Sequence, residues 1–476
     1  MSSPTIAPPV RYRRSLAGPV VLIALGVLFL LMTTNVISGR QFFRLFADFW
    51  PLLLVLWGVV KLVEHYQAKR EDAIAPGIGV GGGMLMFFVV VAGLAASSAR
   101  HWNFNAMREE LEIDGTPLAA VFGEEYNFDD EVVQDLPAGS SLKVVSDRGS
   151  IAVNVWDQNK VRVVGHKRLY ADSQKAADEK SAKTKPQITS EGTTVLVSAN
   201  TNAVGESGVR TDLEVFVPRT LAVEISTRKG DVNLLGREGD VKVNNQRGDV
   251  SIENVTGNTS VRMDRGSLRL GKISGNVQVE GTVDNTEVAD VGGTVQMNVN
   301  GDFFGSISLS KIAKAVTLRS ERTEIDFAKI EGELRMESDD LRASQVLGPV
   351  RVVTRSKDIH LNDVTGDVKV ENDNGEVELQ PAAKLPLGNF EISNKRGSIM
   401  LTLPPRANFQ ILAKTDHGEV ESDFEQLKTI DPEEEGQAST ISGTVGNGAS
   451  KVQLNSEYGN IEVKKVAPPE VASKEL

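Results

Sequence analysis

The feature that most constrains the fold of this chain is a short phrase that recurs every 18 residues in its second half. Each copy begins with a glycine, which is followed by a small polar residue and, in most copies, by an apolar residue. The first series has its glycines at Gly230, Gly248 and Gly266. A second series with the same spacing lies nine residues out of phase, at Gly239, Gly257, Gly275 and Gly293. A fixed short period is typical of a solenoid, in which each coil buries its apolar face on the next.

The segment after each glycine alternates between apolar and polar residues, as in residues 232–234 and 250–252. Period two places the apolar side chains on one face of a β-strand. Glycine followed by Asp, Asn or Ser suits a turn, because glycine tolerates positive φ and short polar side chains bond the nearby backbone. We therefore predict an all-β domain over residues 228–465, a β-solenoid with two strands in each coil of about 18 residues. Equal spacing favours coils over the alternative, a stack of antiparallel hairpins.

The predicted coils align their inward-facing residues in ladders that run along the solenoid. Two such ladders are Val232/Val250/Leu268 and Val241/Thr259/Val277/Val295. The phase of the repeat slips near Phe303, and the sequence predicts that the coils resume at Gly332.

The residues on either side of the repeat have a different pattern. Residues 141–227 contain longer alternating segments and are predicted to form a β-rich head region of the same domain. Within them, residues 171–183 are polar and rich in alanine, which indicates a solvent-facing helix or a mobile excursion. We expect a connector at residues 99–140 and a disordered tail at residues 466–476.

The amino-terminal part of the chain contains three apolar segments, at about residues 15–38, 46–63 and 77–98. The first is long enough to cross a hydrocarbon core of roughly 30 Å as a helix. It is also too long for a signal peptide, and two more apolar segments follow it. The second segment is short, although Lys61 can extend its charged end toward the interface. We predict three transmembrane helices within residues 15–98.

The distribution of Lys and Arg predicts the orientation of these helices. The amino-terminal residues 1–14 and the second loop carry six of these residues, whereas the first loop and the segment after residue 98 carry four. The excess favours a cytoplasmic amino terminus and an extracytoplasmic C-terminal domain. If the second segment only lies on the membrane surface, the large domain is cytoplasmic instead.

Composition excludes several classes of function. The net charge is −12; residues 1–99 hold 8 Lys/Arg against 4 Asp/Glu, which leaves 44 against 60 for the rest. So acidic a C-terminal part argues against broad nucleic-acid binding. The chain has no cysteine, so disulfides, thiol nucleophiles and zinc–thiolate or iron–sulfur sites are impossible. The five histidines show no metal-ligand spacing, and we expect no cofactor, no metal and no nucleic-acid partner.

Two regions of the sequence resemble known families. The phrases Gly18–Leu31 and Phe49–Gly58, which includes Trp-Pro-Leu-Leu, resemble the LiaI–LiaF-like transmembrane region of bacterial envelope-stress proteins. The Gly-Asp-Val repeats after residue 140 look like the putative-adhesin β-strand-repeat family, a domain of unknown function. The first resemblance implies a bacterial inner-membrane protein whose partners are the lipid bilayer and a membrane signalling protein. The second implies a surface domain, and neither supplies catalytic residues.

The best candidate site residues are Lys229, Arg247 and Arg265, each of which directly precedes a turn glycine. Equal spacing should stack these cations in one column, where they can contact an anionic envelope polymer or lipid headgroups. The alternative is a solvated corner that is balanced by Asp231, Asp249 and Asp264. The tripeptide Arg-Gly-Asp at 247–249 is one instance of the same turn. Because a single glycine precedes each aspartate, the series indicates turns rather than a calcium-binding nonapeptide solenoid.

These patterns predict a non-enzymatic bacterial membrane protein that displays an extracytoplasmic β-solenoid. Its predicted role is envelope binding, an adhesion-like role or stress sensing. One alternative is a scaffold that self-associates, because open solenoid ends can add strands. Another is a β-helix enzyme acting on polysaccharide. The adjacent carboxylates of Asp129–Asp130 and Asp339–Asp340 make poor acid–base pairs, because neighbours on a strand point to opposite faces.

Overall fold

The computed structural model describes most of the chain from Glu124 onward and parts of what precedes it. The described residues are 23, 26–27, 30, 39–70, 83–84, 86–92, 94, 112–113, 116–117, 124–204, 209–300, 305–383, 386–430 and 438–466. They form two compact units. Unit 1 comprises Met1–Phe128, Lys167–Thr184 and Asn202–Arg210. Unit 2 comprises Asp129–His166, Lys185–Thr201 and Thr211–Leu476.

Unit 1 contains a 32-residue helix, α2 (Gly39–Arg70), which encloses the second predicted apolar segment and has Pro51 in its interior. Large apolar side chains such as Leu52 and Leu62 are exposed on it, whereas Trp57 is buried. No helix in the described part of the chain has both the length and the apolar character that a membrane span requires. The predicted segments 15–38 and 77–98 lie mainly outside the described residues, so the count of three helices stays a prediction.

The rest of unit 1 is small. Strands β1 (Glu112–Ile113) and β2 (Thr116–Pro117) form an antiparallel pair. The alanine-rich segment forms the helix α6 (Gln174–Lys183), which begins after the N-cap Ser173. Its Ala177 is buried against Leu169 and Val209. One short 3-10 helix, η1, spans Thr201–Val204.

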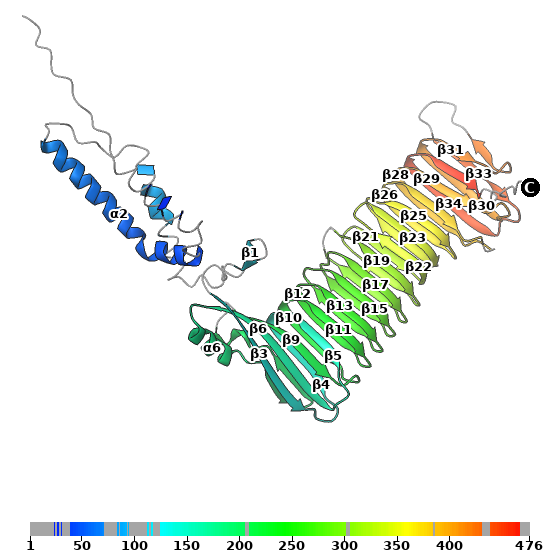
Figure 1. The fold of residues 1–476 in the computed structure, drawn as a ribbon. Coiled ribbons are helices and arrows are strands. Elements are labelled where there is room, and N and C mark those ends of the chain that lie inside the picture. Colours follow the sequence, from blue (N-terminus) through cyan, green and yellow to red (C-terminus); the bar gives the residue numbers. More distant parts are fainter. Residues whose placement is uncertain are drawn as a thin grey trace, which may run out of the picture. The chain divides into compact units, whose positions relative to one another are not determined.

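Most strands lie in two large sheets, whose stacked coils form the solenoid of unit 2 (Figure 1). Sheet I has 17 strands, in the order β7 (Gln187–Glu191), β8 (Thr194–Ser198), β4 (Ser141–Arg148), β10 (Val223–Lys229), β12 (Val241–Arg247), β14 (Thr259–Met263), β16 (Val277–Gly281), β18 (Val295–Val299), β20 (Val316–Arg319), β21 (Thr323–Phe327), β24 (Val350–Thr354), β26 (Val368–Asn374), β28 (Phe390–Arg396), β34 (Ser450–Tyr458), β30 (Phe409–His417), β33 (Ser439–Val445) and β32 (Lys428–Ile430).

Sheet II has 16 strands, in the order β3 (Glu124–Asp135), β6 (Lys160–Ala171), β9 (Val209–Val217), β5 (Ile151–Val155), β11 (Val232–Arg237), β13 (Val250–Val255), β15 (Leu268–Ile273), β17 (Thr286–Val291), β19 (Ile307–Ile312), β22 (Lys329–Met336), β23 (Asp340–Leu347), β25 (Asp358–Val364), β27 (Val377–Pro381), β29 (Ile399–Leu403), β35 (Ile461–Lys465) and β31 (Val420–Ser422). The strand β3 begins inside the segment that the sequence assigned to a connector.

The predicted ladders are present in the parallel coils. Val232 pairs with Val250, and Val250 pairs with Leu268, in successive strands of sheet II. The ladder from Val241 to Val295 runs in the same way through sheet I. All of these side chains are at most 2% exposed, and the apolar ones belong to one continuous hydrophobic core between the two sheets. Parallel coils, not hairpins, therefore account for the 18-residue period.

The solenoid departs from the prediction where the repeat changes phase. The slip near Phe303 is only an insertion, because β18 still pairs in parallel with β20 across it. The real break follows: β21 and β22 run antiparallel to their neighbours on both sides, so one coil is traversed in reverse. Gly332 lies inside β22, where the pairing register shifts, and not in a turn. The prediction that coils resume at Gly332 was wrong.

The carboxyl-terminal coil does not occupy the end of the solenoid. Strand β34 lies between β28 and β30 in sheet I, and β35 lies between β29 and β31 in sheet II. The final coil of the sequence is thus inserted between two coils that precede it in the chain.

Candidate functional site

The turn at one corner of the solenoid fixes the position of each candidate cation. Gly248 has a φ of 130°, and a Cβ on it would lie 2.3 Å from the carbonyl oxygen of Gly230 in the neighbouring coil. Such close stacking requires glycine, both for the backbone conformation and for the space. The backbone N–H of Gly230 donates to the carbonyl oxygen of Arg247 at 2.9 Å, and that of Gly248 donates to Arg265 at 3.2 Å.

The structure brings the three predicted cations together and adds a fourth. Lys229 pairs in register with Arg247 on one side and with Arg148 on the other. We name the set Arg148, Lys229, Arg247 and Arg265 the basic column. In the next coil the equivalent position is Val283, which is buried, and the column ends there.

Arg148 is missing from the prediction because a long excursion separates it from Lys229 in sequence. The signal was present: Arg148-Gly149-Ser150 repeats the phrase Arg265-Gly266-Ser267. Its register was hidden because β5 to β9 intervene before the regular 18-residue spacing begins.

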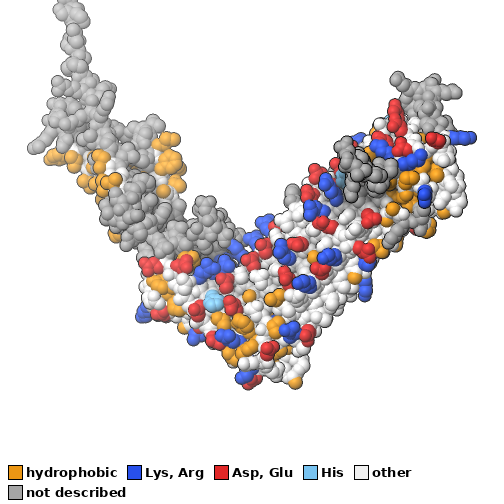
Figure 2. All heavy atoms as spheres, turned by 45° about the vertical axis from the view of Figure 1, so that its right-hand side comes forward, with side chains coloured by type: hydrophobic (Ala, Val, Ile, Leu, Met, Phe, Trp, Pro, Cys, Tyr) orange, Lys and Arg blue, Asp and Glu red, His pale blue; other side chains and the backbone are white. Residues whose placement is uncertain are grey.

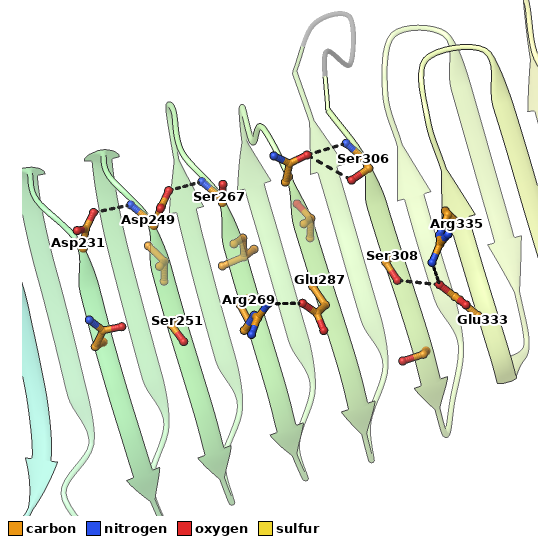
Figure 3. A pocket seen from close by; sticks show the side chains of 16 residues that line it. Asp231, Asp249, Ser251, Ser267, Arg269, Glu287, Ser306, Ser308, Glu333 and Arg335 are labelled. Atoms are coloured by element: carbon orange, nitrogen blue, oxygen red, sulfur yellow. Dashed lines mark hydrogen bonds and ion pairs between the residues drawn. The ribbon is translucent and has the colours of Figure 1, made fainter. Parts of the chain in front are cut away.

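The aspartates beside the basic column have a structural role. Asp231 accepts a hydrogen bond from the backbone N–H of Asp249 at 3.0 Å, and Asp249 accepts one from that of Ser267 at 2.8 Å (Figure 3). Each carboxylate thus connects its coil to the next one. Arg247 and Arg265 are exposed and form no ion pair within 4.0 Å among the residues that the structure describes. Direct pairing with neighbouring aspartates therefore does not explain these two cations.

The second turn series forms the same kind of ladder at the opposite corner. Asp240 accepts from the backbone N–H of Asn258 at 2.8 Å, and Asn258 accepts from that of Asn276 at 3.0 Å. Asn276 accepts in turn from Thr294 at 3.0 Å. These oxygens face backbone donors, as turn-forming residues do. Across the described segments, no group of three or more potential metal ligands comes together.

Two buried cations are structural. Arg237 occupies a position where the next coil has Val255, and its guanidinium donates to the carbonyl oxygens of Pro218 at 2.8 Å and Asn154 at 2.7 Å. Burial, with a smaller contribution from Arg219, lowers the pKa of Arg237 to about 10. The ammonium of Lys357 donates to the carbonyl oxygen of Ser338 at 2.8 Å in the hairpin between β22 and β23. Burial lowers its pKa as well.

The paired carboxylates that a polysaccharide-active enzyme would need are separated. Asp129 bonds His166 at 2.7 Å, whereas the adjacent Asp130 is less exposed and lies 4.0 Å from Lys185. Asp340 pairs with Arg342 at 2.7 Å, and its neighbour Asp339 is exposed. Alternating exposure along each strand is what opposite-facing neighbours produce.

Comparison with known proteins adds the family. The profile of the family Toastrack DUF4097 matches residues 115–464, and that of the LiaF transmembrane domain matches residues 17–105. No curated protein matches the chain significantly.

Two solved structures align with most of the chain. A "putative cell adhesion protein" from Clostridium sporogenes is 11% identical over 72% of this chain and 100% of that one, with a TM-score of 0.17. A "putative adhesin" from Bacteroides fragilis is 12% identical over 71% of this chain and 97% of that one, with a TM-score of 0.21. The two profile matches show that the chain belongs to the Toastrack DUF4097 family and carries a LiaF transmembrane domain before its Toastrack solenoid.

Proposed function

We propose that this chain is a non-enzymatic, multi-pass protein of the bacterial inner membrane whose extracytoplasmic solenoid binds an anionic polymer of the cell envelope. The LiaF transmembrane domain supports the membrane location. We further propose the lipid bilayer and a membrane signalling protein as partners. One observation carries the binding role: four cations stand in register in successive coils, and two of them have no ion-pair partner among the described residues.

The spacing of the basic column suits a repeating anion. Neighbouring strands in a sheet lie about 4.8 Å apart, so successive coils present their cations at that interval. On the face that Figure 2 shows, Lys/Arg and Asp/Glu side chains are interspersed over the solenoid. The acidic excess of residues 100–476 disfavours an anionic ligand away from the column. Binding through such exposed groups is expected to be weak and salt-sensitive, because charges are screened beyond about 8–10 Å.

Substituting Lys229, Arg247 and Arg265 together by alanine is expected to abolish most polyanion binding. The affinity is measured by calorimetry. Long-chain polyphosphate is titrated into the full-length chain in detergent at a series of salt concentrations. The slope of log K against log salt should shrink by about one for each phosphate that the variant no longer neutralises. The matched control is the triple alanine variant of Arg262, Arg269 and Lys311, cations that already pair with Glu280, Glu287 and Asp290. Equal losses in both variants, or no binding by the wild type, would overturn the proposal.

The orientation has its own test. Protease added to intact spheroplasts should digest the domain after residue 98, because the Lys/Arg excess lies on the other side of the predicted helices. An antibody against the carboxyl terminus follows the loss of the domain on a blot. Full protection in spheroplasts, with digestion after lysis, would place the domain in the cytoplasm.

The ends of the two sheets favour ligand binding over self-assembly. Antiparallel strands cap sheet I, since β7 pairs with β8 and β33 pairs with β30. The terminal strands β31 and β32 have three residues each. The edge strand β3 carries six acidic residues: Glu124, Glu125, Asp129, Asp130, Glu131 and Asp135. Short edges and edges rich in charge hinder the addition of strands from another molecule.

A further inference from the structure

A groove crosses the outer face of sheet II from β11 to β22 (Figure 3). Its volume is about 970 Å³. Half of the residues that line it have hydroxyl or amide side chains, among them Asn233, Ser251, Ser267, Ser306, Ser308 and Ser310. The groove contains no aromatic side chain, and its long direction crosses successive coils.

The strand register explains why this face is hollow. Asn233, Ser251, Arg269, Glu287 and Ser308 form one outward row through five coils. The next outward row places Gly271 beside Ala289, and Ala289 beside Ser310. A Cβ on Gly271 would meet only the Cγ atom of Glu253, at 3.8 Å. In the groove itself, the short side chains of Ser251 and Ser308 lie on either side of the paired Arg269 and Glu287 in their row, and Ser310 lies in the next row.

The charged groups in the groove are already paired with one another. Arg269 bonds Glu287 at 2.9 Å, and Arg335 bonds Glu333 at 3.1 Å. The hydroxyl of Ser308 also donates to Glu333 at 3.1 Å. With Asp231 and Asp249 added, the lining has four acidic and two basic side chains. An anionic chain would be repelled here, in contrast to the basic column.

Two hydroxyls in the groove are available for a ligand. Ser251 and Ser310 are partly exposed, and neither hydroxyl has a partner within the described part of the chain. A serine hydroxyl both donates and accepts hydrogen bonds, so these two hydroxyls match a ligand that itself carries hydroxyl groups. We propose that this groove binds an uncharged linear glycan, which lies along the solenoid axis and meets a new coil about every 4.8 Å.

Filling the groove tests this proposal. Saturation-transfer NMR on the full-length chain in detergent reports weak binding of two neutral probes, chitotetraose and cellotetraose. Ser251→Tyr is expected to lower the affinity for the bound tetrasaccharide by at least about tenfold, because the ring occupies the groove. Ser260→Tyr is the matched control, since Ser260 is also an outward, partly exposed serine, on the outer face of sheet I.

Each result distinguishes binding in the groove from nonspecific binding to the protein surface. No transfer to either tetrasaccharide from the wild type overturns the proposal, as does an equal or larger loss in Ser260→Tyr. Circular dichroism of both variants checks that each remains folded. The variant in which Lys229, Arg247 and Arg265 are alanine should keep its affinity for the tetrasaccharide. If this variant no longer binds polyphosphate but still binds the tetrasaccharide, both proposals are supported. Competition between polyphosphate and the tetrasaccharide would contradict a separate glycan site.

Discussion

Val250→Asp is expected to destabilise the solenoid by about 3–5 kcal/mol, the range for an uncompensated charge in a core. Val250 is 1% exposed and lies between Val232 and Leu268 in the inner ladder. A carboxylate there has no cation to pair with, so it must be buried unpaired or take up a proton. Thermal unfolding of the full-length chain, followed by circular dichroism, measures the loss.

Ser251→Asp provides the control at the adjacent position. Ser251 faces outward beside Arg269 in the next coil, where a carboxylate stays in water. The melting temperature should change little, as for most surface substitutions, which lie within about 0.5 kcal/mol. Equal shifts for the two variants would refute the assignment of inner and outer faces.

Gly248→Ala is expected to cost about 3–5 kcal/mol, because strain and overlap act together. The new Cβ would lie 2.3 Å from the carbonyl oxygen of Gly230, and the φ of 130° disfavours any side chain. The coil that contains Gly230 must move away, which breaks the hydrogen bond from the backbone N–H of Gly230 to the carbonyl oxygen of Arg247. Urea unfolding of the full-length chain measures the change in free energy.

Gly271→Ala is the matched glycine exchange. A Cβ at Gly271 has only the Cγ of Glu253 within reach, at 3.8 Å, so the variant should stay within about 0.5 kcal/mol of the wild type. Comparable destabilisation by both substitutions would show that glycine content, and not the stacked turn, determines stability.

The parallel coils could be predicted because two independent signals coincide in them. Alternation fixes which side chains face inward, and glycine spacing fixes where each coil closes. Both signals are clear from Val232 to Val295, where the predicted ladders are confirmed. The same reasoning aligned Lys229 with Arg247, since each directly precedes a stacked turn.

The reversed coil could not be predicted, because alternation is the same in parallel and antiparallel strands. Residues 323–327 alternate as regularly as any other strand. Their direction is set by the turn after Arg319, where the backbone N–H of Ser320 bonds the carbonyl oxygen of Thr323 at 2.8 Å. That turn contains no glycine and so resembles no other copy of the repeat.

The groove also has no signature in the sequence. Ser251 and Ser310 look like ordinary outward residues of a half-buried strand, and Gly271 looks like a weak point in one. Only the register, which aligns Ser251, Arg269, Glu287 and Ser308 in successive coils, shows that these distant residues line one groove.

The inserted carboxyl-terminal coil has a consequence for biosynthesis. Strands β30 and β31 find their parallel partners only in β34 and β35, which are made last. A ribosome or translocation channel that delivers the chain from its amino terminus can stack coils one by one only as far as β28 and β29. Beyond that point assembly waits for residues 450–465, so a chain cut short before them exposes an unpaired sheet end. Completion of this domain therefore requires that residues 450–465 have emerged, and until then the unpaired sheet end can aggregate with other chains.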